Sequence, residues 1–159
     1  KLAEENEFNK IFILNSFIYL PYNPARIFSL RSYINVLTPF VHYNKKLELA
    51  QINNKEGLKN HIAYWNMPYP PIKNSFDFID KTMKDLDKID EPIFIAHSKN
   101  DPTADKKSAI SVYQRVNSKI KQLNWYDNSS HVLLMDSDRE YLIEDIIKFE
   151  KENWHENKD

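Results

Sequence analysis

An aspartate and a histidine in the second half of the chain have the types and the spacing needed for proton transfer. Asp101 lies in the polar turn after the apolar segment 92–96. His131 follows in a polar loop about thirty residues later, and this Asp-before-His order occurs in hydrolytic sites. Proton transfer near neutral pH needs a base such as imidazole, oriented by a buried carboxylate. A carboxylate at a strand end and an imidazole on a later loop can meet over the edge of a sheet. Taken singly, each residue has an ordinary explanation, as a turn former or as a solvated histidine.

No serine nucleophile that such a pair could activate is recognisable in the chain. There is no Gly-x-Ser-x-Gly motif, and Gly57 is the only glycine. Nucleophile elbows and phosphate-binding loops both need glycine for close backbone approach, so neither is expected here. Ser16, at the end of the first apolar segment, has no flanking glycine, and we reject it as a nucleophile. Acyl transfer by this chain alone is therefore not expected.

Three neighbours of the pair have simpler predicted roles. Asp105 is a local rival of Asp101, but it lies where a helix needs an N-cap. Asp136 is expected to hold the histidine loop through hydrogen bonds to the backbone. His97, at the end of the strand before Asp101, is expected to be packed or to cap. The remaining histidines show no metal-ligand spacing with carboxylates: His42, His61 and His155.

Composition limits the possible class of protein. A chain of 159 residues, 42% hydrophobic and 13% aromatic, can bury the core of one domain. A net charge of −1 gives no reason to expect nucleic acid or an anionic membrane as a partner. The absence of cysteine excludes disulfides and thiolate metal sites and is compatible with a reducing, cytoplasmic location. No apolar run approaches the roughly 18 residues of a membrane span.

Apolar strands alternate with amphipathic helices at both ends of the chain. Strands are predicted over 10–15, 93–96 and 121–126, and their apolar residues suit strands covered on both faces. One helix is expected to begin at Ala104 or Asp105, and the last helix to span 141–153. The predicted fold class is α/β, with parallel strands covered by helices and an inserted helical cap.

The middle of the chain, 25–88, predicts helices without intervening strands. Apolar spacing indicates helices over 27–37 and 55–65, then an extended connector over 67–71. A third helix is expected with Asn74 or Ser75 as its N-cap. Its inner face would carry four residues: Phe76, Ile79, Met83 and Leu86.

This pattern divides the chain into a core strand region (1–24), a helical cap or lid (25–88) and a C-terminal core (89–159). An ordinary helical segment of an α+β domain is the alternative for the middle part. Aromatic cap residues could line an acyl pocket or simply pack: Phe28, Tyr33, Phe40, Tyr43, Tyr64, Trp65 and Tyr69.

Residues 89–149 resemble the C-terminal part of bacterial carboxylesterases. These are lid-bearing α/β-hydrolases related to monoacylglycerol lipases and to the S33 serine aminopeptidases. The resemblance is carried by strand-end Asp101, by Ser-Ala at 108–109 opening a helix, by the strand 121–126, and by the turn at His131 with an aspartate following at 136. Ser129-Ser130 stands where many relatives have glycine. A larger departure is that the first half, with its nucleophile, is missing, so the resemblance covers the C-terminal half only.

The resemblance implies a serine hydrolase that cleaves small acyl esters through an acyl-enzyme. Asp101 would fix the tautomer of His131, and His131 would take the serine proton and deliver it to the leaving alkoxide. The serine would come from the missing N-terminal part, and no metal or organic cofactor is implied. Aminopeptidases, thioesterases and carbon–carbon hydrolases share the same frame and are not separated by this half.

The alternative hypothesis is a protein without catalytic activity, a degenerate hydrolase fragment that acts as a binding or assembly module. A Gly-x-Ser-x-Gly motif encoded within about 30 residues upstream of Lys1 would favour the enzyme. The strand 11–15 would lie inside a larger parental sheet, so in isolation it would expose an apolar edge. Self-association, or pairing with the N-terminal remainder, is expected.

Overall fold

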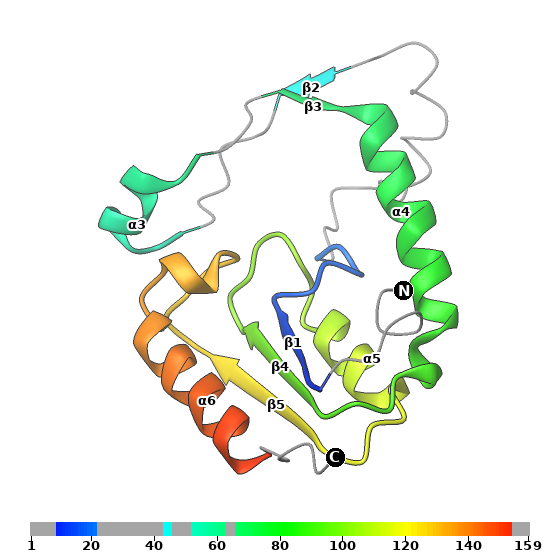
Figure 1. Cartoon of the computed structure of the whole chain (residues 1–159). Helices are drawn as coiled ribbons and strands as arrows, with labels where there is room; N and C mark the ends of the chain where they lie inside the picture. The colour runs from blue at the N-terminus through cyan, green and yellow to red at the C-terminus, as the bar shows by residue number, and fades with distance from the viewer. Residues whose placement is uncertain (1–8, 22–42, 46–51, 63–65, 154–159) are drawn as a thin grey trace.

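The computed structural model describes residues 9–21, 43–45, 52–62 and 66–153. Its main sheet has three parallel strands in the order β1 (Ile11–Leu14), β4 (Ile93–Ser98) and β5 (Lys121–Tyr126). Ile93 pairs with Ile11 on one side and with Lys121 on the other. Because all three strands are parallel, their carboxyl ends share one edge of the sheet (Figure 1). The three predicted strands and the α/β class are confirmed.

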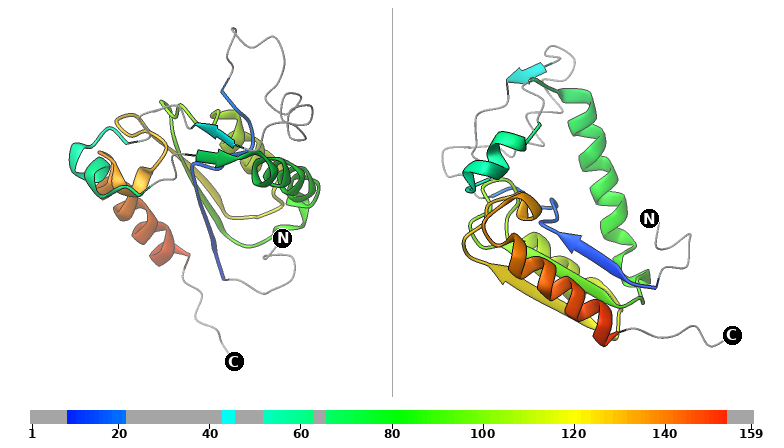
Figure 2. Two further views of the ribbon diagram at one scale, coloured as in Figure 1. Left: turned by 90° about the horizontal axis from the view of Figure 1, so that it is seen from above. Right: turned by 60° about the vertical axis from the view of Figure 1, so that its left-hand side comes forward.

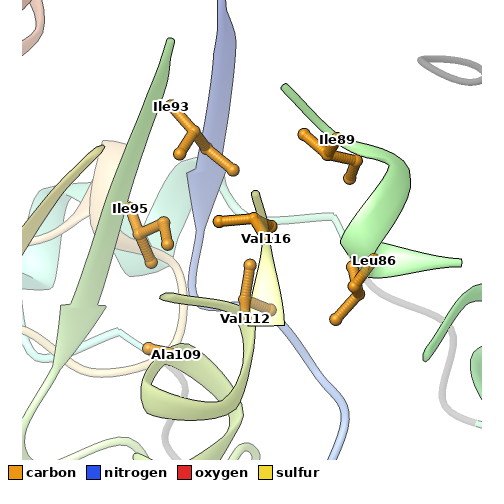
Figure 3. Close-up of a cluster of buried hydrophobic side chains, with 7 residues drawn as sticks. All are labelled: Leu86, Ile89, Ile93, Ile95, Ala109, Val112 and Val116. Carbon is orange, nitrogen blue, oxygen red and sulfur yellow. The ribbon is translucent and has the colours of Figure 1, made fainter. Parts of the chain in front are cut away.

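Two helices cover the opposite faces of this sheet (Figure 1). All six residues of β4 are buried, which explains why its sequence is apolar without alternation. Alternate side chains of β4 enter opposite layers. Ile93 and Ile95 pack with residues of α5 (Lys107–Arg115) and of the segment before β4, as Figure 3 shows. Phe94 and Ala96 pack with Leu142 and Phe149 of α6 (Arg139–Glu152).

The middle of the chain contains a second, smaller sheet that the sequence did not predict. β2 (Tyr43–Lys45) pairs antiparallel with β3 (Asn66–Pro68), so the expectation of helices without strands was wrong. Strands of three residues are too short to show the two-residue alternation that marks a strand in sequence. The pair lies at the far end of α4 (Tyr69–Lys84), away from the main sheet (Figures 1 and 2).

The long helix α4 begins six or seven residues earlier than predicted. The expected extended connector is only half correct, because Pro70 and Pro71 lie in the first turn of α4. The first-turn N–H groups have no intrahelical acceptor, so proline there loses no hydrogen bond. Ser75 donates its hydroxyl hydrogen to the carbonyl of Pro71 and so lies inside the helix rather than at its cap. The predicted inner face is right for Phe76, which is buried, and for Met83, which packs against the core. Leu86 is also buried, but it lies in the short turn after α4.

The other helices also differ from prediction mainly at their ends. α3 (Lys55–Asn60) ends before residue 65, the predicted end of this helix. Residues 63–65 lie outside the described part of the chain. The helix expected over 27–37 lies outside it as well. α5 begins two or three residues after the predicted start, and α6 begins two residues before it. Short 3₁₀ turns, η1 (Leu86–Lys88) and η2 (Leu133–Met135), precede β4 and α6. In the described residues, no helix is long and apolar enough to cross a membrane.

Candidate active site

Asp101 and His131 meet at the carboxyl edge of the main sheet. Nδ1 of His131 lies 2.7 Å from Oδ2 of Asp101. The aspartate follows β4 and the histidine follows β5, so two neighbouring parallel strands end beside the pair. The Asp101 side chain is 1% exposed, whereas that of His131 is 24% exposed. The prediction that these two side chains converge is confirmed, with the carboxylate buried and the imidazole partly exposed.

The carboxylate of Asp101 is held by its own turn as well as by His131. Its second oxygen, Oδ1, accepts the backbone N–H of Thr103 at 2.7 Å and of Ala104 at 3.0 Å. Burial alone would raise the pKa of Asp101, but the hydrogen bonds from His131 and from these two N–H groups outweigh it and lower the pKa below its ordinary value. Asp101 is therefore ionised at neutral pH and acts only as an acceptor.

An ionised Asp101 decides which ring nitrogen of His131 carries hydrogen. A carboxylate can only accept, so Nδ1 is the donor and Nε2 of the neutral ring keeps its lone pair. The half-exposed ring can present that lone pair to a reacting group. This arrangement can take a proton from a hydroxyl and return it to a leaving group.

The side chain of Asp136 holds the loop that carries His131. Its carboxylate accepts four backbone N–H groups, those of Ser130 at 2.7 Å and of Asn53, Asn54 and Ser137 at 2.8 Å. Burial would raise the pKa of Asp136, but these N–H groups lower it overall. The predicted loop-holding role is confirmed. The structure adds that the same carboxylate also binds the segment leading into α3.

Asp105 takes part in the start of α5 instead of the site. The prediction that Asp105 is the N-cap of α5 was wrong by one residue, because Lys106 occupies that position. Oδ1 of Asp105 still accepts the N–H of Lys107 in the first turn, at 2.8 Å. The choice of Asp101 over Asp105 as the partner of His131 is therefore supported by geometry.

Comparison with known protein sequences identifies the family of this chain. Residues 59–138 match the sequence profile of the family described as "Serine aminopeptidase, S33". The chain belongs to this family. It is also 32% identical over 88 residues to a carboxylesterase of Bacillus subtilis (strain 168), a match that covers 55% of this chain and 36% of that protein.

Solved structures show that the chain has the α/β-hydrolase fold. The monoacylglycerol lipase of Paleococcus ferrophilus superposes with a TM-score of 0.78 at 12% identity, over 96% of this chain and 62% of that one. A soluble variant of monoglyceride lipase from Saccharomyces cerevisiae, in complex with a substrate analog, gives 0.75 at 16% identity, over 97% and 59%. This S33-family chain therefore spans less than two thirds of the length of these relatives.

His97 is a packed core residue of this S33-family chain, as predicted. Its ring is fully buried, lies edge-on to Trp125 with centroids 5.8 Å apart, and has Nε2 3.3 Å from the carbonyl of Ala104. Burial lowers the pKa of His97, although the nearby Asp101 carboxylate opposes the shift. The ring is thus neutral at physiological pH.

The remaining sequence candidates do not extend the site. Ser16 has a buried Oγ without a hydrogen-bond partner, so its hydroxyl makes no hydrogen bond to His131. No group of three potential ligands that could hold a metal occurs within the described ranges. His42 and His155 lie outside those ranges. Five of the proposed pocket residues also lie outside them: Phe28, Tyr33, Phe40, Tyr64 and Trp65. For the other two, Tyr43 and Tyr69, only the backbone is described.

One residue of the site was missed by the sequence reasoning. Asn15 directly follows β1, is 5% exposed, and donates its side-chain N–H groups to the backbone carbonyls of Ser130 and His131. The available signal was its place at the end of a parallel strand, where functional side chains of such sheets gather.

Proposed function

We propose that this chain forms the cap and C-terminal core of a serine hydrolase that cleaves carboxylic esters. The division into 1–24, 25–88 and 89–159 assigns the main sheet to the first and third parts and the lid to the second. The nucleophilic serine would be supplied by an N-terminal part outside these residues. The observation that carries the proposal is the 2.7 Å contact between ionised Asp101 and Nδ1 of the half-exposed His131.

In the proposed reaction, the two residues move one proton through each half of the cycle. Nε2 of His131 removes the proton of the serine hydroxyl as its oxygen attacks the ester carbonyl. Asp101 stabilises the resulting imidazolium, which then protonates the leaving alkoxide. Water then gives a proton to the same nitrogen as its oxygen attacks the acyl carbon. When the bond between the acyl carbon and the serine oxygen breaks, the imidazolium returns this proton to the serine oxygen, which releases the acid and restores the neutral imidazole. The cycle needs no cofactor.

Two observations support an ester as the substrate class. The relative with 32% identity is named a carboxylesterase, and two structural relatives are monoacylglycerol or monoglyceride lipases. The proposed substrates are therefore carboxylic esters, with the short- or medium-chain acyl group that the resemblance to carboxylesterases implies.

Hydrolysis of p-nitrophenyl esters tests the proposal. A longer form that joins this chain to an upstream segment with a Gly-x-Ser-x-Gly motif should release p-nitrophenol and become covalently labelled on that serine by a fluorophosphonate probe. The chain Lys1–Asp159 alone should do neither, because it lacks the nucleophile and the oxyanion donors. A longer form that binds esters without cleaving them would contradict the proposal and favour a non-catalytic binding module.

The outer edge of β1 gives a second expectation for the isolated chain. Within the described residues β1 pairs only with β4, and Phe12 at its centre remains 37% exposed. An unpaired apolar edge promotes association between chains. The isolated chain should therefore elute as oligomers in size-exclusion chromatography with light scattering, and the longer form, whose added strand would cover this edge, as a monomer. A stable monomer of the isolated chain would contradict this.

A further inference from the structure

The side chain of Asn15, which directly follows β1, joins the end of β4 to the loop that follows β5. Its Oδ1 accepts the backbone N–H of Ser98, the last residue of β4, at 2.7 Å. Its Nδ2 donates to the carbonyl of Ser130 at 3.0 Å and to the carbonyl of His131. Both amide hydrogens are thus used on the loop that follows β5, and the acceptor is used on β4.

The backbone of Asn15 is fixed as tightly as its side chain. Its N–H donates to the carbonyl of Ala96 at 2.9 Å, which continues the β1–β4 ladder by one residue. Its φ of 44° lies in the left-handed region, which side chains other than asparagine and aspartate rarely adopt. A strained backbone angle in a buried residue persists only where the surroundings hold it in place.

We propose that Asn15 is a positioning residue that sets the distance between His131 and Asp101, an inference that rests on the proposed function. Asp101 is fixed on the β4 side by the N–H groups of Thr103 and Ala104. The backbone that carries the His131 ring is fixed on the other side by the two Asn15 donors. Asn15 also binds the N–H of Ser98, which lies at the end of β4 shortly before Asp101. One side chain therefore contacts both the backbone that leads to Asp101 and the backbone that carries His131. It thereby keeps Nδ1 of His131 on Asp101 and Nε2 free for the serine proton.

The experiment measures the tautomer of His131 in the chain Lys1–Asp159 by long-range ¹H–¹⁵N NMR, with signals assigned by their loss in His131→Ala. Asn15→Gly removes the side chain without adding strain at positive φ. Asn15→Asp keeps the shape and the acceptor but loses both donated hydrogens, and it provides the same comparison if the glycine variant does not fold. Asn100→Ala is the matched control, since Asn100 donates to the carbonyl of Asp127 at the same edge of the sheet, at 2.7 Å.

In the unaltered chain the neutral ring of His131 should be mainly the Nδ1–H tautomer. Loss of the Asn15 donors should raise the ratio of Nε2–H to Nδ1–H about tenfold, the factor expected from weakening one hydrogen bond to a charged group. Asn100→Ala should leave the ratio unchanged. An unchanged ratio in the Asn15 variants, the same change in Asn100→Ala, or no Nδ1–H preference in the unaltered chain would each overturn the proposal. Failure of the longer form to cleave esters would instead refute the proposed function, because the tautomer is measured without catalysis.

Discussion

Replacing His131 by alanine in the longer form should lower kcat for p-nitrophenyl ester hydrolysis by about 10⁴- to 10⁶-fold, with KM little changed. The imidazole of His131 is bound to Asp101 through Nδ1, and in the proposed mechanism its Nε2 accepts the serine proton. It would act on the reacting atoms in the transition state and make no substrate-binding contact in the ground state, so the loss should fall on kcat. The measurement is steady-state kinetics, and labelling of the serine by the fluorophosphonate probe should be lost together with hydrolysis, because both need the base.

Two aspartate variants separate this mechanism from a general loss of structure. Asp101→Asn should lower kcat by about 10⁴-fold, because an amide at this position can donate to Nδ1 and so favours the wrong tautomer. Asp105→Asn should stay within a few-fold of the parent, since that carboxylate binds only the start of α5. Hydrolysis retained at more than a tenth in His131→Ala, or equal losses in the two aspartate variants, would remove the pair from the mechanism.

The acid–base pair could be predicted from the sequence because it depends on local features. Asp101 ends an apolar segment that is buried on both faces, and His131 follows the next strand, so their meeting needs only the rule that parallel strands end at one edge. The choice between Asp101 and Asp105 likewise followed from helix capping.

The supporting contacts could not be predicted because they join residues far apart in the chain. Asn15 reaches a strand end 83 residues away and a loop 115 residues away, and no local pattern indicates which polar residue will do so. The helix start at Tyr69 was missed for a different reason, since proline breaks a helix interior but suits its first turn. The small β2–β3 sheet depends on pairing between segments that are too short to be recognised singly.

α3 lies beside η2, the turn that follows the loop of His131 (Figures 1 and 2). Gly57, the only glycine of the chain, is the residue of α3 that lies against the backbone of this turn. A Cβ added at Gly57 would lie 1.9 Å from the backbone carbonyl oxygen of Met135 and 3.2 Å from Ile52. Met135 precedes Asp136, whose carboxylate binds Asn53 and Asn54 just before α3. Backbone atoms on both sides of the contact are therefore held by hydrogen bonds, and a methyl group cannot be accommodated by a side-chain rotation.

Gly57→Ala should therefore destabilise the protein by about 1–3 kcal/mol, the usual cost of overpacking. In a solvent-exposed helix the same substitution would stabilise by about 1 kcal/mol, because alanine is the better helix former. The clash with Met135, rather than helix propensity, thus decides whether the substitution lowers or raises the free energy of unfolding. Urea unfolding measures the free energy, and hydrogen exchange of the Asn53, Asn54 and Ser130 amides shows whether the loss is centred on Asp136. Lys59→Ala, on the exposed part of the same helix, should change stability by less than about 0.5 kcal/mol. A Gly57→Ala protein as stable as the parent, with these amides equally protected, would show that α3 does not pack on the histidine loop as the structure has it.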